Sequence, residues 1–182
     1  MLLTAFFALP DVGQVDAFAE PWRRLYSHSP LVSTVVLFGH IGGLLAGGGL
    51  ALAADRATLR VDGSNDAERS RHLDDLLRLR RPVGTALGIA AVSGALLFFA
   101  DVEAFAASRI FWAKMALIVV LLTNVAVVVR VESALRARPT QGPLESLWAA
   151  RERLWRRRRA SAVVSVALWF ILVLAGTALA SH

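Results

Sequence analysis

The sequence predicts an all-α integral membrane protein built as a bundle of four transmembrane helices. Three observations predict this fold. Hydrophobic residues make up 56% of the 182 residues, and the mean hydropathy is +0.56, whereas an ordinary soluble domain is about 45–50% apolar. The apolar residues are concentrated in four long stretches, and the basic residues are concentrated between those stretches. We therefore expect residues 31–180 to form a single four-helix transmembrane domain.

The four stretches are each long enough to cross a bilayer, whose core of about 30 Å needs about 20 apolar helical residues. They are residues 31–54, 82–100, 111–129 and 160–180. Two of them have no ionisable side chain, and the other two carry only His40 and Lys114, respectively. The stretches are continuously apolar and too long for the alternating strands of a membrane barrel, so they are predicted to be helices.

The two loops 55–81 and 130–159 predict the orientation. They hold seven and nine arginines, which is 16 of the 20 basic residues of the chain. Positive charge accumulates on the cytoplasmic side of a membrane protein, so both termini are expected outside, in a multi-pass protein of the bacterial inner membrane. A run of four arginines directly before the last span is predicted to meet anionic lipid headgroups rather than nucleic acid: Arg156, Arg157, Arg158 and Arg159.

Residues 1–30 precede the first span and are predicted to lie on the outer face. Residues 1–10 form a poor signal peptide, because they have no positive n-region and no small-residue cleavage site follows them. We interpret them as a retained interfacial segment. Trp22 and Tyr26, close to the first span, are the expected aromatic anchor at the membrane surface.

Both inner loops are predicted to contain amphipathic helices. In the first, residues 66–81, Ser64 and Asn65 are candidate caps, and one face has i, i+3, i+4, i+7 spacing: Leu73, Leu76, Leu77 and Arg80. In the second, residues 143–159, Pro143 suits the first helical position, and one stripe is apolar: Leu144, Leu147, Trp148, Leu154 and Trp155. The second helix is expected to run into the last span. It would either lie at the lipid interface or dock a partner.

His40 is the most informative polar residue in the spans. It lies nine residues into the first span, about 14 Å deep at 1.5 Å per residue, where an ionisable group is a functional hypothesis. Gly43 and Gly47 share its helix face and leave room for a haem to approach it. The second haem ligand would be Met115 or His40 of a second copy. The ladder Gly39, Gly43 and Gly47 is equally typical of close helix packing. In that interpretation His40 hydrogen-bonds a neighbouring helix.

Three further polar residues lie in or beside the spans. Asp101 and Lys114 end and begin consecutive spans, and we expect an ion pair between them that fixes the hairpin. The alternative is one end of a proton path towards His40. Asn124 lies deep in the third span, where an interhelical hydrogen bond contributes about 0.6 kcal/mol.

The sequence also excludes several chemistries and so bears on function. It has no cysteine, which excludes disulfides, zinc–thiolate sites and iron–sulfur clusters, and it has no phosphate loop, nucleophile elbow or zinc-protease motif. We therefore expect a non-catalytic accessory or scaffold subunit of a larger inner-membrane complex for respiratory or photosynthetic electron transfer. Its expected partners are lipids and other subunits, or further copies of itself. The alternatives are a small b-type haem or metal-handling protein using His40 and, third, a small-solute channel or transporter; no cofactor is favoured.

The polar and glycine pattern over residues 31–130 resembles that of small four-helix bacterial inner-membrane proteins of the copper-resistance D-like kind. The resemblance rests on a set of single residues and dipeptides: His40, Gly43, Gly47, Arg81-Pro82, Ser93-Gly94, Asp101, Phe111, Lys114 and Asn124. It implies a protein that handles copper or binds b-type haem, with His40 as the candidate ligand. The chain departs from that pattern because its spans have no second histidine and no cluster of Met or Cys.

Overall fold

The computed structural model describes residues 12–61, 65–137 and 144–180, and the elements in these ranges are all helices. They are α1 (Val12–His28), α2 (Pro30–Arg60), α3 (Asp66–Ala100), α4 (Val102–Ala107), α5 (Arg109–Arg136) and α6 (Leu144–Ala180). The helices α2, α3, α5 and α6 are each long and apolar enough to cross a membrane. In these ranges the predicted all-α architecture with four candidate spans is confirmed.

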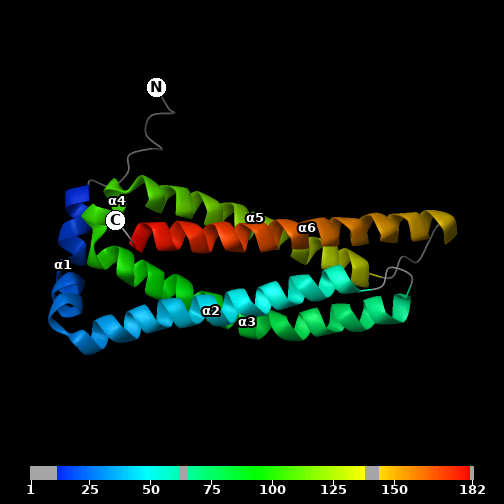
Figure 1. Cartoon of the computed structure of the whole chain (residues 1–182), viewed down its shortest axis with the longest axis horizontal. Coiled ribbons are helices and arrows are strands. Elements are labelled where there is room, and N and C mark those ends of the chain that lie inside the picture. The colour runs from blue at the N-terminus through cyan, green and yellow to red at the C-terminus, as the bar shows by residue number, and fades with distance from the viewer. Residues whose placement is uncertain (1–11, 62–64, 138–143, 181–182) are drawn as a thin grey trace, which may run out of the picture.

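The four long helices form two antiparallel hairpins, α2 with α3 and α5 with α6, which meet mainly where α2 packs against α6 (Figure 1). The short helix α1 crosses one end of the bundle, the end at which α6 also finishes (Figure 1). The described parts of residues 55–81 and 130–159 lie at the other end, which we call the arginine-rich end (Figure 1). Both inner loops of the predicted topology therefore lie together.

The amphipathic segments of the arginine-rich end are not separate helices. Residues 66–81 belong to α3, which continues through Pro82 to Ala100, and α6 runs without a break from Leu144 to Ala180. The predicted continuity of the second segment with the last span is thus confirmed. Asn65 begins α3, because its side chain accepts hydrogen bonds from the N–H groups of Ala67 and Glu68, both at 3.1 Å. Residues 1–10, Ser64 and Pro143 lie outside the described residues.

The arginine-rich end has a hydrophobic core of its own. Its buried side chains come from all four long helices: Val61 at the end of α2, Leu73 and Leu76 of α3, Val131 and Leu135 of α5, and Trp155 of α6. Trp155 is only 1% exposed, whereas Leu77 and Trp148 of the predicted apolar stripes are 41% and 52% exposed. The stripes are therefore divided: one part packs helix against helix, and Leu77 and Trp148 stay exposed. A second core, in the apolar half, is formed by Leu121, Leu168, Trp169 and Leu172.

At the opposite end, Trp22 ties α1 to the bundle. Its Nε1 donates a hydrogen bond to the carbonyl oxygen of Leu96 in α3 at 2.8 Å. The ring of Tyr26 lies 6.0 Å from that of Trp22. The structure thus gives Trp22 a specific partner within the protein, and the position of both rings at the membrane surface stays a prediction.

Candidate functional site: a buried charge network

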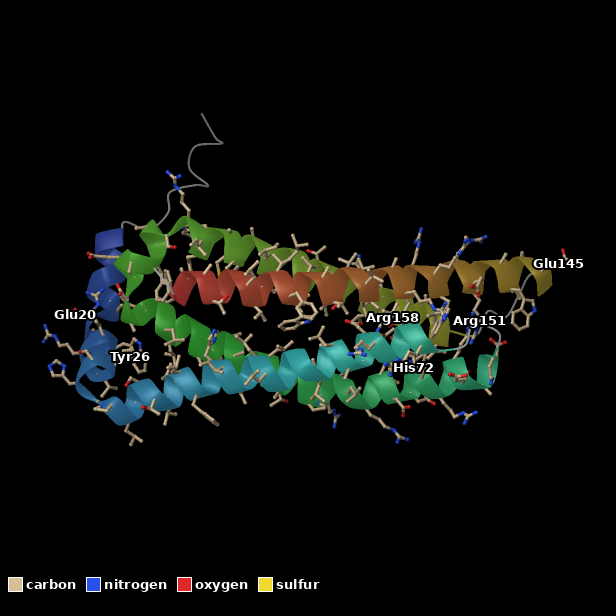
Figure 2. The ribbon with its side chains drawn as sticks, in the orientation of Figure 1. Glu20, Tyr26, His72, Glu145, Arg151 and Arg158 are labelled. Atoms are coloured by element: carbon tan, nitrogen blue, oxygen red, sulfur yellow. The ribbon has the colours of Figure 1, made fainter. Side chains whose placement is uncertain are left out.

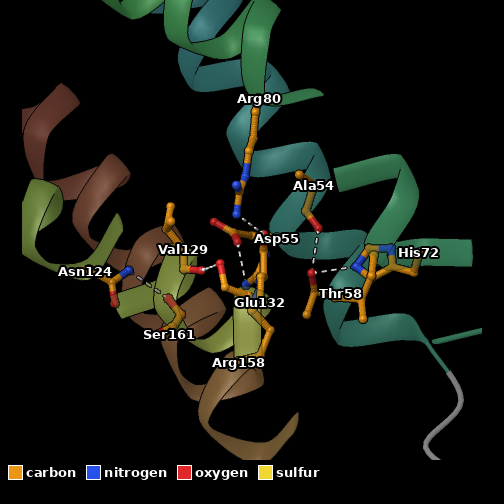
Figure 3. A network of polar contacts seen from close by, with 12 residues as sticks. Ala54, Asp55, Thr58, His72, Arg80, Asn124, Val129, Glu132, Arg158 and Ser161 are labelled. Carbon is orange, nitrogen blue, oxygen red and sulfur yellow. Dashed lines mark hydrogen bonds and ion pairs between the residues drawn. The ribbon is translucent and has the colours of Figure 1, made fainter. Parts of the chain in front are cut away.

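A network of buried charges joins the four long helices at the arginine-rich end (Figure 3). At its centre is Arg158 of α6, whose side chain is 2% exposed. Its Nη1 donates to Asp55 Oδ1 of α2 at 3.1 Å, and its Nε donates to Glu132 Oε1 of α5 at 3.0 Å. Because charge-assisted hydrogen bonds to a guanidinium are directional, Arg158 fixes the positions of α2 and α5 relative to α6.

The other oxygen of Glu132 extends the network to α3. Glu132 Oε2 accepts a hydrogen bond from Arg80 Nη2 at 3.0 Å and lies 3.6 Å from Arg136 Nη2. Arg136 also donates to the carbonyl oxygen of Leu73 at 2.7 Å. A buried charge without a partner is strongly destabilising, and here both carboxylates have guanidinium partners. The result is a closed ionic cluster of three arginines and two acids.

A second polar group lies beside this network, between α2 and α3. The hydroxyl of Thr58 donates to the carbonyl oxygen of Ala54 at 3.0 Å and lies 2.9 Å from His72 Nε2 (Figure 3). A hydroxyl has one proton, so in this arrangement His72 donates from Nε2. The edge of the His72 ring contacts Trp155, with ring centroids 6.3 Å apart, and the guanidinium of Arg69 lies 5.2 Å from the Trp155 ring centroid on α6.

The predicted lipid-facing arginine run is divided by the structure. Arg156 and Arg157 are exposed, as the headgroup interpretation needs. Arg158 is buried in the network, and Arg159 is half-buried and donates to the carbonyl oxygen of Val61. Four consecutive helical residues point in directions about 100° apart, so they cannot all face lipid. The headgroup prediction does not hold for Arg158 and Arg159.

No pattern in the sequence marks Asp55, Glu132, Arg80 or His72 as a site residue. One signal was present for the acids: Asp55 and Glu132 lie one and three residues beyond the ends of the spans 31–54 and 111–129. A carboxylate so close to the apolar region needs a cation. Figure 2 shows where this part of the molecule lies: Arg158 and His72 are at the arginine-rich end, far from Glu20 and Tyr26.

The sequence-predicted ligand His40 contacts α3. Its Nδ1 lies 2.8 Å from the carbonyl oxygen of Ala90 and must donate, because a carbonyl only accepts. Met115 is 38% exposed on α5, and no Cα atom of α2 lies within 8 Å of a Cα atom of α5. The pairing of His40 and Met115 as haem ligands therefore stays a prediction. The described residues do not include a group of three or more His, Asp or Glu side chains able to hold a metal ion.

The predicted packing residues lie at helix contacts. A Cβ atom on Gly43 would lie 2.6 Å from the carbonyl oxygen of Ala86, and one on Gly47 would lie 2.7 Å from Leu87 Cδ2. These two glycines let α2 approach α3 closely, while a Cβ on Gly39 would make only ordinary contacts at 3.7 Å. Asn124 donates from Nδ2 to the carbonyl oxygen of Ser161 at 3.1 Å, which links α5 to α6.

The expected ion pair between Asp101 and Lys114 is not formed in the part of the chain that the structure describes. Asp101 is exposed, and its Oδ1 accepts a hydrogen bond from the N–H of Ala104 at 3.2 Å. The carboxylate therefore caps α4, a short helix that the sequence analysis did not predict in this loop. Lys114 is half-buried on α5.

Comparisons with protein-family models, with curated proteins and with solved structures find no match to this chain. The resemblance to copper-resistance D-like proteins therefore stays a prediction. No copper-handling or haem-binding role is carried over to the chain from a relative.

Proposed function

We propose that the chain is a multi-pass protein of the bacterial inner membrane, with its arginine-rich end in the cytoplasm and both termini outside. Four candidate spans and the 16 arginines in two loops support this orientation. The two loops lie at the same end of the bundle, as a four-span topology requires (Figure 1).

Within that membrane, its role is that of a non-catalytic accessory or scaffold subunit of a larger complex, which we assign to respiratory or photosynthetic electron transfer. The observation that carries the scaffold role is the closed network around Arg158. Its buried carboxylates are bound by arginines of the same chain, so these groups hold four helices together. A rigid frame of this kind suits a protein that positions others.

The helix α5 is the surface on which we expect a partner subunit to pack. Only 6% of its most apolar 18-residue window is buried within the chain, compared with 28% for α6. It lies at the edge of the bundle and packs mainly against α6 (Figure 1). In membranes, helices associate through van der Waals packing of such faces. Val120 is 50% exposed on this helix, and Leu37 is 47% exposed on α2.

Native electrophoresis of the tagged chain, extracted in mild detergent from the membranes of its own cell, tests the subunit role. We expect a band well above the 19.6 kDa chain that contains other polypeptides. Val120→Trp is expected to reduce that band at least threefold, and the matched Leu37→Trp variant to leave it unchanged. A wild-type chain that migrates alone would contradict the proposal.

A b-type haem site at His40 is the second candidate, because of one observation. The hydrogen bond from Nδ1 to the Ala90 carbonyl leaves the Nε2 lone pair available, which is the usual arrangement of a ligating histidine. His40 therefore fits one axial position of a haem.

A reduced-minus-oxidised absorbance spectrum of the purified protein separates the two candidates. The subunit role predicts no haem bands. Bands that disappear in His40→Ala and persist in the control His28→Ala, at an exposed histidine of α1, would establish the haem site and contradict the first candidate.

A further inference from the structure

A groove of about 980 Å³ opens between α2 and α3 at the arginine-rich end. Its lining changes character along α2. Gly49, Leu52 and Ala53 form an apolar part towards the membrane half, and Arg56 and Arg60 follow on the same helix face at spacings of three to four residues. A groove that is apolar at one end and charged at the other matches a molecule with a hydrocarbon tail and a charged head.

The cations of this groove differ from those of the buried network. Arg56 and Arg60 are exposed, and in the described part of the chain neither forms an ion pair or a side-chain hydrogen bond. From the α3 side, Arg71 lines the same groove, and its Nε donates to the carbonyl oxygen of its own helix at Ala67. Guanidinium groups bind phosphate oxygens through paired hydrogen bonds. The groove therefore offers a phosphate site that the described side chains do not fill.

Acidic side chains line the α3 side of the same groove, namely Glu68 and Asp75. Asp75 lies one helical turn from His72 on the side facing the membrane half. Because His72 is level with Thr58, Asp75 lies at about the level of Arg56 in the antiparallel helix. A carboxylate there disfavours a second negative charge and attracts a cation. The best match is a headgroup with one phosphate and one ammonium group.

We infer that this groove binds a phospholipid with a phosphoethanolamine headgroup. The phosphate lies against Arg56 and Arg60, the ammonium group lies towards Asp75, and an acyl chain follows the apolar surface at Leu52 and Ala53. Basic pockets between helices on the cytoplasmic side are known sites for lipid headgroups. The inference rests on the bundle crossing a bilayer and is independent of any partner subunit.

Native mass spectrometry of the full chain, released from detergent with added lipid, tests the site. The probes are phosphatidylethanolamine and phosphatidylglycerol with identical palmitoyl and oleoyl chains. We expect the phosphatidylethanolamine adduct to exceed the phosphatidylglycerol adduct at least threefold, and Arg56→Gln with Arg60→Gln to reduce it at least fivefold. The matched control is Arg78→Gln with Arg81→Gln, two exposed arginines of α3 outside the groove, which should retain it.

A second pair of variants tests the ammonium contact separately. Asp75→Asn is expected to remove the preference for phosphatidylethanolamine, while the neighbouring Asp74→Asn, exposed and outside the groove, keeps it. Equal binding of the two lipids by the wild-type protein would overturn the inference. So would an equal loss in the groove variants and their controls, because it would indicate only a bulk charge effect.

Discussion

The substitution Arg158→Met removes the guanidinium that bridges Asp55 to Glu132. Glu132 keeps Arg80 at 3.0 Å and Arg136 at 3.6 Å, but Asp55 loses its ion-pair partner while its side chain is only 8% exposed. Removing one member of a buried ion pair typically costs about 3–5 kcal/mol. At roughly 2–4 °C per kcal/mol for a chain of this size, the unfolding midpoint should fall by about 6–20 °C.

The matched control is Arg157→Met, because Arg157 is exposed on the same helix and the substitution removes the same charge. A surface change of this kind is expected to alter stability by about 0.5 kcal/mol or less. Thermal unfolding of both variants, followed by circular dichroism in one detergent, measures the difference. Equal midpoints for the two variants would refute the structural role of Arg158.

A triple variant separates the cost of an unpaired charge from the loss of packing. Replacing Asp55 and Glu132 with leucine in the Arg158→Met background leaves no buried carboxylate in the network. Apolar replacement of a buried ion cluster is often neutral or stabilising, and the two arginines that remain, Arg80 and Arg136, are 36% and 22% exposed. The triple variant should therefore unfold at a higher temperature than Arg158→Met alone. A still lower midpoint would mean that the hydrogen-bond geometry, rather than the balance of charge, stabilises this end.

Three further predictions concern helix contacts and use the same unfolding assay. Gly43→Ala should destabilise the protein by about 1–3 kcal/mol, because the new methyl group would collide with the backbone of α3. The control Gly49→Ala, where nothing lies within 4 Å, should be neutral or stabilising by up to about 1 kcal/mol. Similar losses of stability in both variants would contradict the close approach of α2 to α3. Trp155→Ala should cost about 3–5 kcal/mol and Trp148→Ala far less, so the reverse order would contradict the core at the arginine-rich end. Asn124→Leu should cost about 0.6 kcal/mol and at most about 1.7 kcal/mol, and a larger loss would mean that Asn124 does more than bond to Ser161.

The spans could be predicted from the sequence because their signal is local. A continuous apolar stretch identifies a candidate membrane helix without knowledge of its neighbours, and all four stretches lie within long helices. Spacing along one helix likewise placed Gly43 and Gly47 on a common face, and a Cβ on either would collide with α3.

The network could not be predicted because its contacts are distant in the sequence. Asp55 and Arg158 are 103 residues apart. The rotation of α6 against α2 and α5 decides which of the four consecutive arginines points inward. Hydropathy assigns all four to the membrane surface. The prediction of an Asp101–Lys114 ion pair was wrong for a related reason. The helix α4 was not predicted, and Asp101 is its N-terminal cap.

The most direct test of the subunit role is a mass measurement. Membranes of the protein's own cell are extracted into native nanodiscs without detergent, and the protein mass of the particle that contains this chain is measured. The proposal predicts a particle in which the 19.6 kDa chain is present in fixed stoichiometry with other membrane polypeptides. A protein mass of 19.6 kDa, or a multiple of it with no other polypeptide present, would contradict the proposal.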